Sequence, residues 1–303
     1  FFRRLVTLIA ECTRVNVIGN ESLRHAARID HLDRVRWIPV DTNDCWIRDY
    51  GPIFVVDARE HSYAIDWRYN AWGGKYPPWD DDDRATASII DKAGWTRVPG
   101  NLCLEGGALE WDGNGRLLTT TRCLVTETRN PAVSKADVES LLRDVAGASE
   151  IVWVDGGGLA GDDTDGHIDQ LARFIDAENI VVATCDASDA ENHAGLESNL
   201  KLLRRWARST QPRVSVHPLP IPPPRRIDRQ RVPESYCNFL HVGQDRILVP
   251  TFGAAEHDAY ALELLARLVR ARSSRTEVIG VDCRDLVWGL GAIHCATCHE
   301  PKR

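Results

Sequence analysis

The sequence predicts a mixed α/β fold, and two observations lead to that prediction. Short runs rich in Val and Ile, which are typical of strands, alternate with runs of helical periodicity along the whole 303-residue chain. Turn signals between apolar runs also predict β-hairpins, which a purely parallel, doubly wound sheet does not need. We therefore expect one α/β domain over residues 1–303.

The predicted strands are short and rich in β-branched residues. They are Val15–Ile18, Val35–Val40, Ile53–Val56, Ile151–Val154, Ile180–Ala183, Val214–Val216 and Ile247–Val249. Between two apolar runs, Asp112–Gly115 (DGNG) predicts a hairpin turn. Ile221–Pro224 predicts a stiff extended connector. Because strand signals continue on both sides of that connector, it does not mark a domain boundary.

The predicted helices show apolar residues at helical spacing. They are Leu23–Ile29, Ala85–Ala93, Asp137–Val145, Ala190–Ala207 and His257–Arg270. Gly94 follows the second of these and is a typical helix-ending residue. Ser134 stands three residues before Asp137, a spacing that predicts an N-terminal cap.

Composition narrows the function classes. The formal net charge of −7 argues against a nucleic-acid partner, which needs a basic face, and favours small cationic molecules. No run approaches the ~18 apolar residues that a membrane span requires, so no membrane partner is expected. Nine cysteines without a framework pattern indicate reduced thiols and a cytoplasmic location.

Four segments carry more Gly, Trp and acidic residues than folding requires. They are Trp46–Pro52, Leu104–Gly107, Thr164–Asp169 and the pair His294–Cys295. Within the third, His167 and Asp169 are two residues apart, so on an extended segment both would point to the same side. A histidine beside a carboxylate can carry protons near neutral pH.

The C-terminal string Cys295–His299 (CATCH) allows three interpretations: c-type haem attachment, a zinc site or a nucleophilic thiol. Haem is disfavoured because only four residues follow His299 and the chain has no Met. Zinc needs four ligands, and the adjacency of His294 and Cys295 limits this string to three. A thiol among carboxylates makes sense if the substrate is a cation, and a planar guanidinium accepts bidentate carboxylates.

Five short motifs occur in the order found in agmatine deiminases: Trp46–Pro52 (WIRDYGP), Leu104–Gly107 (LEGG), Gly166–Asp169 (GHID), Tyr236–Phe239 (YCNF) and Gly291–Cys295 (GAIHC). Over nearly its whole length, the chain resembles this family, which is grouped with bacterial peptidyl-arginine deiminases. The resemblance implies a five-bladed, pseudo-symmetric α/β propeller (pentein-like) with a central active site. It also suggests that the family's first strand would precede Phe1.

The resemblance assigns Cys295 as nucleophile and His167 as proton shuttle. It implies that Asp49 and Asp169 grip the guanidinium and that Glu105 orients His167 or contacts the substrate. Trp46 and Asn238 would line the pocket, and Cys298 and His299 would be bystanders. No metal or organic cofactor is expected.

Two substrate classes stay open within the family. Members that act on peptidyl arginine follow the Tyr-Asn pair with arginines that bind a carboxylate, whereas Tyr69–Asn70 is followed here by Ala71–Gly74 (AWGG). Agmatine, which has an amine instead, is therefore the expected substrate, and the acidic run Asp80–Asp83 could attract that amine or be a solvated loop. Departures at Tyr50 and Leu290–Cys295 (LGAIHC) keep arginine peptides and other guanidines open.

Functions outside the family are a non-catalytic guanidine-binding protein or a thiol protease. The first would be expected to lack Cys295 or His167, and the second needs an oxyanion hole and a neutral pocket. Self-association as a homodimer stays open.

Overall fold

Four three-stranded sheets share one topology, in which an antiparallel pair is followed by a strand parallel to the second strand. The computed structural model describes residues 1–29, 31–271 and 273–301. The strands are β3 (Ile53–Val56), β4 (Ser62–Arg68), β5 (Thr96–Cys103); β6 (Glu110–Trp111), β7 (Arg116–Thr119), β8 (Glu150–Trp153); β9 (Ala172–Asp176), β10 (Asn179–Thr184), β11 (Ser215–Pro220); and β14 (Leu240–Val242), β15 (Arg246–Thr251), β16 (Glu277–Asp282).

A long helix connects the two parallel strands of each of these sheets, as a parallel pairing requires. These helices are α5 (Asp80–Ala93), α7 (Lys135–Ala146), α8 (His193–Ala207) and α9 (Ala255–Arg270). Each buries an apolar stripe; in α8 the stripe includes Leu196, Leu200 and Leu203 at helical spacing. Within the described residues, no helix is long and apolar enough to cross a membrane.

The remaining β structure is smaller. A two-stranded parallel sheet contains β1 (Val15–Gly19) and β2 (Val35–Pro39), and a short hairpin contains β12 (Arg226–Ile227) and β13 (Gln230–Arg231). The other helical segments are α1 (Phe2–Ala10), η1 (Glu21–Leu23), α2 (Arg24–Ala27), α3 (Ile47–Tyr50), α4 (Ala71–Gly74), η2 (Gly106–Ala108), α6 (Thr121–Leu124), η3 (Ile168–Gln170) and η4 (Leu286–Gly289).

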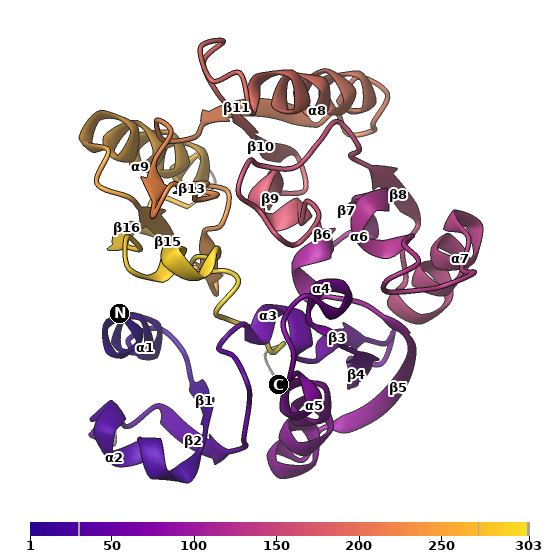
Figure 1. Cartoon of the computed structure of the whole chain (residues 1–303), viewed down its shortest axis with the longest axis vertical. Helices are drawn as coiled ribbons and strands as arrows, with labels where there is room; N and C mark the ends of the chain where they lie inside the picture. The colour runs from indigo at the N-terminus through magenta and orange to yellow at the C-terminus, as the bar shows by residue number, and fades with distance from the viewer. Residues whose placement is uncertain (30, 272, 302–303) are drawn as a thin grey trace.

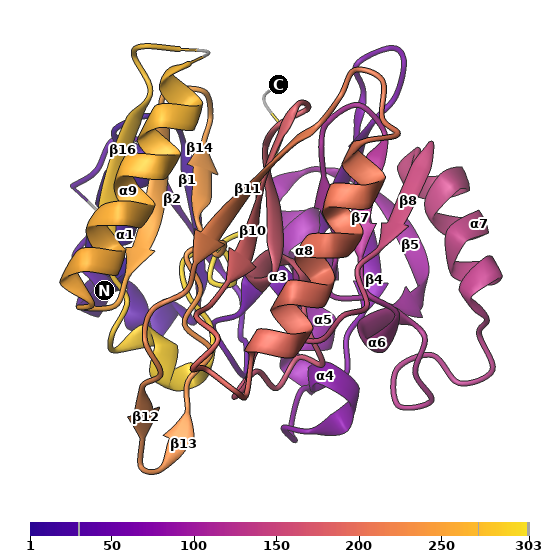
Figure 2. The same cartoon turned by 90° about the horizontal axis from the view of Figure 1, so that it is seen from above.

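Figure 1 shows the sheets arranged around a common centre, with α5, α7, α8 and α9 on the outside and α3 near the middle. Seen from the side in Figure 2, the β12–β13 hairpin extends from the face on which α4 also lies. Buried apolar residues fill the space between each sheet and its helix. A third cluster, to which both α3 and α5 contribute, includes Trp46, Tyr69, Trp72 and Cys295.

Several sequence predictions are confirmed. Ser134 and Asp137 form a reciprocal capping box at the start of α7, and residues 112–115 connect the antiparallel strands β6 and β7. The alternative that the acidic run is a solvated loop is wrong, because Asp80–Asp83 forms the first turn of α5, where carboxylates are stabilised by the helix dipole. The repeated topology had no counterpart in the sequence, where no internal repeat is evident.

Candidate active site

Asp49 lies on α3 with its side chain turned into the protein. Its carboxylate accepts hydrogen bonds from the backbone N–H of Gly107 (3.0 Å) and the indole N–H of Trp72 (3.0 Å). Burial raises the pKa of Asp49, while the adjacent His167 opposes that rise. These partners make a buried carboxylate tolerable at this position.

Two glycines after Glu105 let this segment pack closely against the backbone of Arg48 and the side chain of His167. A Cβ at Gly106 would lie 2.2 Å from the carbonyl oxygen of Arg48, and one at Gly107 would lie 2.5 Å from His167 Nδ1. No side chain larger than hydrogen fits at either position. The two glycines therefore allow a close approach that any other residue would prevent.

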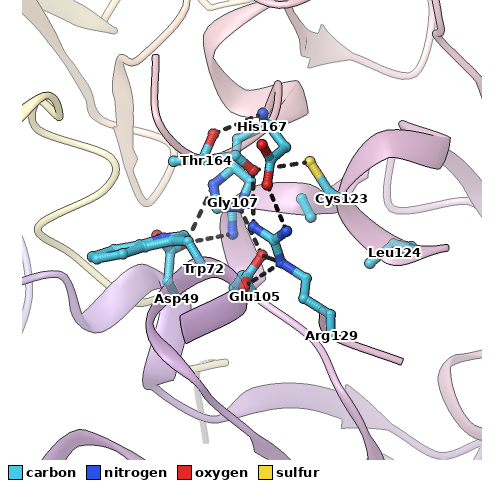
Figure 3. A network of polar contacts seen from close by, with 12 residues as sticks. Asp49, Trp72, Glu105, Gly107, Cys123, Leu124, Arg129, Thr164 and His167 are labelled. Carbon is cyan, nitrogen blue, oxygen red and sulfur yellow. Dashed lines mark hydrogen bonds and ion pairs between the residues drawn. The ribbon is translucent and has the colours of Figure 1, made fainter. Parts of the chain in front are cut away.

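Glu105 and His167 form a fully buried pair (Figure 3). His167 Nε2 lies 3.1 Å from Glu105 Oε2, and Arg129 Nε contacts both oxygens of the same carboxylate at 2.7 and 2.9 Å. Because a carboxylate only accepts hydrogen bonds, Nε2 carries a proton. Burial opposes a charge on the imidazole, but Asp49 and Glu105 outweigh it and raise the pKa of His167 to about 9. His167 is thus an imidazolium at neutral pH.

A second cluster surrounds the thiol of Cys295. Oδ2 of Asp169 lies 2.8 Å from His294 Nδ1, 3.2 Å from Asn238 Nδ2 and 3.6 Å from Cys295 Sγ. Asn238 also donates a hydrogen bond to Sγ at 3.1 Å and accepts one from the backbone N–H of His294 at 3.0 Å. Burial holds the pKa of His294 well below its usual range, so its neutral ring donates to Asp169.

The thiol of Cys295 is held in its protonated form. Burial raises its pKa well above the usual value, and the carboxylates of Asp169 and Asp49 raise it further. The hydrogen bond from Asn238 acts in the opposite direction but is a smaller effect. Only a positive charge placed near the sulfur would make the thiolate favourable, which is the condition expected if the substrate is a cation.

Two buried polar atoms at this site have no hydrogen-bond partner among the described residues. They are Nδ1 of His167 and Oδ1 of Asp169. His167 Nδ1 lies 3.5 Å from a carboxylate oxygen of Asp49, beyond a good hydrogen bond. Since buried polar groups are nearly always paired, one donor and one acceptor here are available to a bound molecule.

Two tryptophans flank the clusters. Trp46 is buried, and a Cβ at Gly291 would lie 2.5 Å from its ring. Trp72 lies in α4, where Ala71 and Trp72 both have left-handed backbone (φ 50° and 56°). Such backbone costs roughly 1–2 kcal/mol per non-glycine residue, and it directs the indole toward Asp49. Strain of this kind is typical of functional sites.

One local expectation is wrong. His167 and Asp169 do not lie on an extended segment, because Asp169 is within η3 and His167 immediately precedes it. Left-handed backbone at Asp165 and Gly166 (φ 70° and 98°) turns the chain just before them. The turn sends His167 to Glu105 and Asp169 to the thiol, so both still reach one site.

The residues that follow Cys295 contact different parts of the protein. Cys298 donates to the carbonyl of Pro52 at 3.1 Å. His299 was expected to be a bystander, yet its Nδ1 lies 3.1 Å from Arg48 Nη2, and Arg48 Nε donates to the carbonyl of His294 at 3.3 Å. Among the described residues, no group of three or more His, Cys, Asp or Glu side chains is arranged to hold a metal ion.

A cavity of about 240 Å³ lies beside Trp72. Its lining combines aromatic rings with two carboxylates: Asn43, Asp44, Tyr69, Ala71, Trp72, Tyr76, Pro77, Pro78 and Asp82. Of the acidic run, only Asp82 is in this lining. Its neighbours serve the fold, since Asp83 accepts the backbone N–H of Tyr69 and Asp81 pairs with Arg84.

Comparison with known proteins identifies the family. The model of the Porphyromonas-type peptidyl-arginine deiminases matches residues 1–301. The chain belongs to that family. An agmatine deiminase from Pseudomonas aeruginosa (strain LESB58) is 32% identical over 298 residues, covering 91% of this chain and 79% of the relative.

Solved structures of this deiminase family agree with the fold. A Porphyromonas gingivalis structure, described provisionally as an arginine deiminase, has a TM-score of 0.91 and 34% identity over 99% of this chain and 88% of its own. A substrate-bound agmatine deiminase variant from C. jejuni has a TM-score of 0.87 and 29% identity, over 97% and 84% respectively. The chain therefore has the mixed α/β fold of these deiminases and is a hydrolase acting on C–N bonds.

The structure brings together every residue predicted for the site: Trp46, Asp49, Glu105, His167, Asp169, Asn238 and Cys295. Sequence reasoning missed three of their partners, namely Trp72, Arg129 and His294. His294 was considered only as a possible zinc ligand, and Trp72 lies in the AWGG segment that was used only to judge the substrate. Nothing about Arg129 distinguishes it in the sequence from the other arginines.

Proposed function

We propose that this protein is an agmatine deiminase, which hydrolyses the guanidinium of agmatine to N-carbamoylputrescine and ammonia. The observation that carries the proposal is the thiol of Cys295, which is buried and lies beside the carboxylate of Asp169. Such a thiol would ionise when a cationic substrate binds next to it. Relatives and solved structures described as agmatine deiminases, similar over most of the chain, support this substrate.

The carboxylates supply the binding energy in this proposal. Asp49 and Asp169 grip the guanidinium from two sides through charge-assisted hydrogen bonds. The free Oδ1 of Asp169 is an acceptor already available for one guanidinium N–H. Asn238 holds the sulfur through its 3.1 Å contact, and Trp46 belongs to the same buried cluster as Cys295.

The first half of the reaction forms a covalent intermediate. Once the guanidinium is bound, the thiol of Cys295 releases its proton to solvent. The thiolate attacks the guanidinium carbon, and the electron pair of the C=N bond moves to nitrogen, giving a tetrahedral adduct. His167, protonated at neutral pH, donates its Nδ1 proton to one amino group. The C–N bond then breaks, ammonia leaves, and a thiouronium remains on the sulfur.

The second half is hydrolysis of that thiouronium. The now neutral Nδ1 of His167 takes a proton from water as the oxygen attacks the same carbon. Collapse of the adduct forms the C=O bond and breaks the C–S bond, whose electron pair returns to sulfur. The hydroxyl proton is taken up by the sulfur, which regenerates the thiol of Cys295 and releases the neutral ureido product. Glu105 keeps Nε2 protonated throughout and so directs Nδ1 to the reacting atoms.

The cavity beside Trp72 supports agmatine over substrates with a carboxylate. Its acidic groups, Asp44 and Asp82, suit an amine at the far end of the substrate, and its aromatic rings can stack on a cation. Asp82 would be largely ionised above its raised pKa of about 6. Peptidyl arginine remains the second candidate, because the family model is that of peptidyl-arginine deiminases.

Beyond the site, we propose that the whole chain forms one five-bladed propeller. The four sheets of equal topology, together with the β1–β2 sheet, support five units around the centre seen in Figure 1. The nine cysteines are all unpaired, which supports a reducing, cytoplasmic location.

The test is ammonia release from agmatine, free arginine and arginyl peptides, with Cys295→Ala as the inactive comparison and Cys298→Ala as the matched control. We expect turnover of agmatine above the others, lost in Cys295→Ala and kept in Cys298→Ala. Turnover of none of these guanidines, or full activity in Cys295→Ala, would disprove the proposal. Preference for arginyl peptides would move the assignment to the second candidate.

A further inference from the structure

Arg129 is a buried cation that lies outside all the sequence motifs. In space, only Glu105 separates it from His167. The side chain of Arg129 is inaccessible to solvent, and it contacts Glu105, which in turn contacts His167. We infer that Arg129 is a positioning residue that fixes Glu105 and, through it, the imidazole of His167. The inference rests on the proposed deiminase function.

The guanidinium of Arg129 spans three groups at once (Figure 3). Nε contacts both oxygens of Glu105, Nη1 donates to Asp165 Oδ2 at 2.7 Å, and Nη2 donates to the carbonyl of Thr164 at 3.0 Å. A rigid planar fork can satisfy these directions together, whereas the ammonium of a lysine is a compact point charge on a flexible stem.

The side chain and the backbone of His167 each contact a residue that Arg129 holds. Its ring meets Glu105 at 3.1 Å, and its backbone N–H donates to Thr164 Oγ1 at 3.0 Å. Asp165, between Thr164 and Gly166, has left-handed backbone (φ 70°), which a non-glycine residue keeps only when its surroundings stabilise it. Arg129 supplies two stabilising contacts, at Thr164 and Asp165.

The fork also reaches the loop that carries Trp72. Lys75 follows α4 and donates to the same oxygen of Asp165 at 2.8 Å. Polar contacts therefore run from Lys75 through Asp165, Arg129 and Glu105 to His167. The side chain of Arg129 holds Glu105, Asp165 and Thr164 together, so its loss removes three of these contacts at once.

Charge gives Arg129 a second effect on His167. The imidazole faces the carboxylates of Asp49, Glu105 and Asp169, and Arg129 is the positive charge in direct contact with Glu105. The other titratable groups around Glu105 are neutral at pH 7: Tyr69, Cys103 and Cys123. Removing a positive charge makes every neighbouring group hold its proton more tightly.

The experiment measures kcat/KM for agmatine against pH in Arg129→Gln, Arg129→Lys and the control Arg231→Gln. Arg231 is a matched control because it also makes a buried fork, to Asp189, and its side chain pairs with Asp189 and Glu191 instead of with the groups that Arg129 holds. We expect Arg129→Gln to move the whole profile up by about 1 pH unit. Arg129→Lys keeps the charge, so its pH profile should not shift. Its kcat should still fall roughly tenfold or more, because lysine cannot form the planar fork.

Two outcomes would overturn the inference. One is an unshifted profile in folded Arg129→Gln, which would reduce Arg129 to a structural role. The other is wild-type kcat in Arg129→Lys, which keeps the test decisive even if loss of a buried partner prevents Arg129→Gln from folding.

A readout that does not need turnover separates this inference from the proposed function. The imidazole titration of His167 can be followed by NMR with ¹⁵N-labelled histidine, assigned by comparison with His167→Gln. We expect it to move to higher pH in Arg129→Gln and to stay unchanged in Arg231→Gln. If the wild-type protein released no ammonia from any guanidine, the proposed function would fail while this titration would still decide the role of Arg129.

Discussion

The sulfur of Cys295 lies 3.6 Å from a carboxylate oxygen of Asp169. The thiol that we propose as the nucleophile thus lies against a carboxylate. In the empty site this contact favours the thiol, since a second charge next to Asp169 is unfavourable. Reactivity then depends on the charge that the substrate brings.

Replacing Asp169 by Asn should change thiol reactivity and catalysis in opposite directions. The thiol pKa should fall by about 1 unit or more, so alkylation of Cys295 by the neutral reagent iodoacetamide at pH 7.5 should become faster. Agmatine turnover should fall about a hundredfold or more, because the guanidinium loses a charged partner. Mass spectrometry of the C-terminal peptide measures the alkylation.

Both proteins in that comparison should carry Cys298→Ser, so that the peptide has one reactive thiol. Asp189→Asn, which removes a buried carboxylate elsewhere, should leave the alkylation rate unchanged. Slower alkylation in Asp169→Asn would show that Asp169 activates the sulfur.

The raised pKa of His167 makes stability depend on pH. Because the folded pKa of about 9 lies above the unfolded value of about 6.5, the imidazolium stabilises the fold fully below pH 6.5. That contribution, on the order of 3 kcal/mol, is lost as pH rises through 9. Urea unfolding of the wild type and His167→Gln should be measured from pH 6 to 9.5. The difference between their free energies of unfolding should become smaller as the pH rises. A constant difference would contradict the expected shift.

Replacing Trp72 by Phe should weaken substrate binding by Asp49, although the new residue is still aromatic. The change removes the indole hydrogen bond to Asp49 but keeps an aromatic ring for the edge-to-face contacts with Tyr69 and Tyr76. We expect kcat/KM for agmatine to fall by about tenfold, since a hydrogen bond to a charged group contributes about 1.5–3 kcal/mol.

Trp153→Phe is the control for that change, because it loses an indole hydrogen bond to Glu139 away from the site. It should leave kcat/KM nearly unchanged. Equal losses in Trp72→Phe and Trp153→Phe would argue against a specific role for Trp72.

Cys298 and metal ions should be dispensable. The thiol of Cys298 donates to the backbone of Pro52 and is not directed at the Asp169 cluster. Cys298→Ala should therefore retain activity within about twofold, since a weak hydrogen bond in a turn contributes little. Ammonia release should also be unaffected by EDTA, and strong inhibition by the chelator would instead support a metal centre.

Much of the fold and the site could be predicted from the sequence where the signal is local. Helical periodicity gave α8 and α9 within a few residues, and the Ser134–Asp137 spacing gave a cap that the structure contains. Strands such as β9 and β16 were missed. β16 pairs with β15 across the whole of α9, whereas β9 forms a hairpin with the adjacent β10. In both cases strand formation depends on the partner strand more than on local preference.

The sequence by itself determined the chemistry: one thiol, one imidazole and a set of carboxylates in a recognisable order. Only the tertiary structure decided which atoms of these groups face one another. Arg129 shows the difference, because an arginine has no local feature that reveals whether it lies in solvent or in a buried fork on Glu105. Its role depends on contacts between residues distant in sequence, and those exist only after burial has excluded water and fixed each partner's direction.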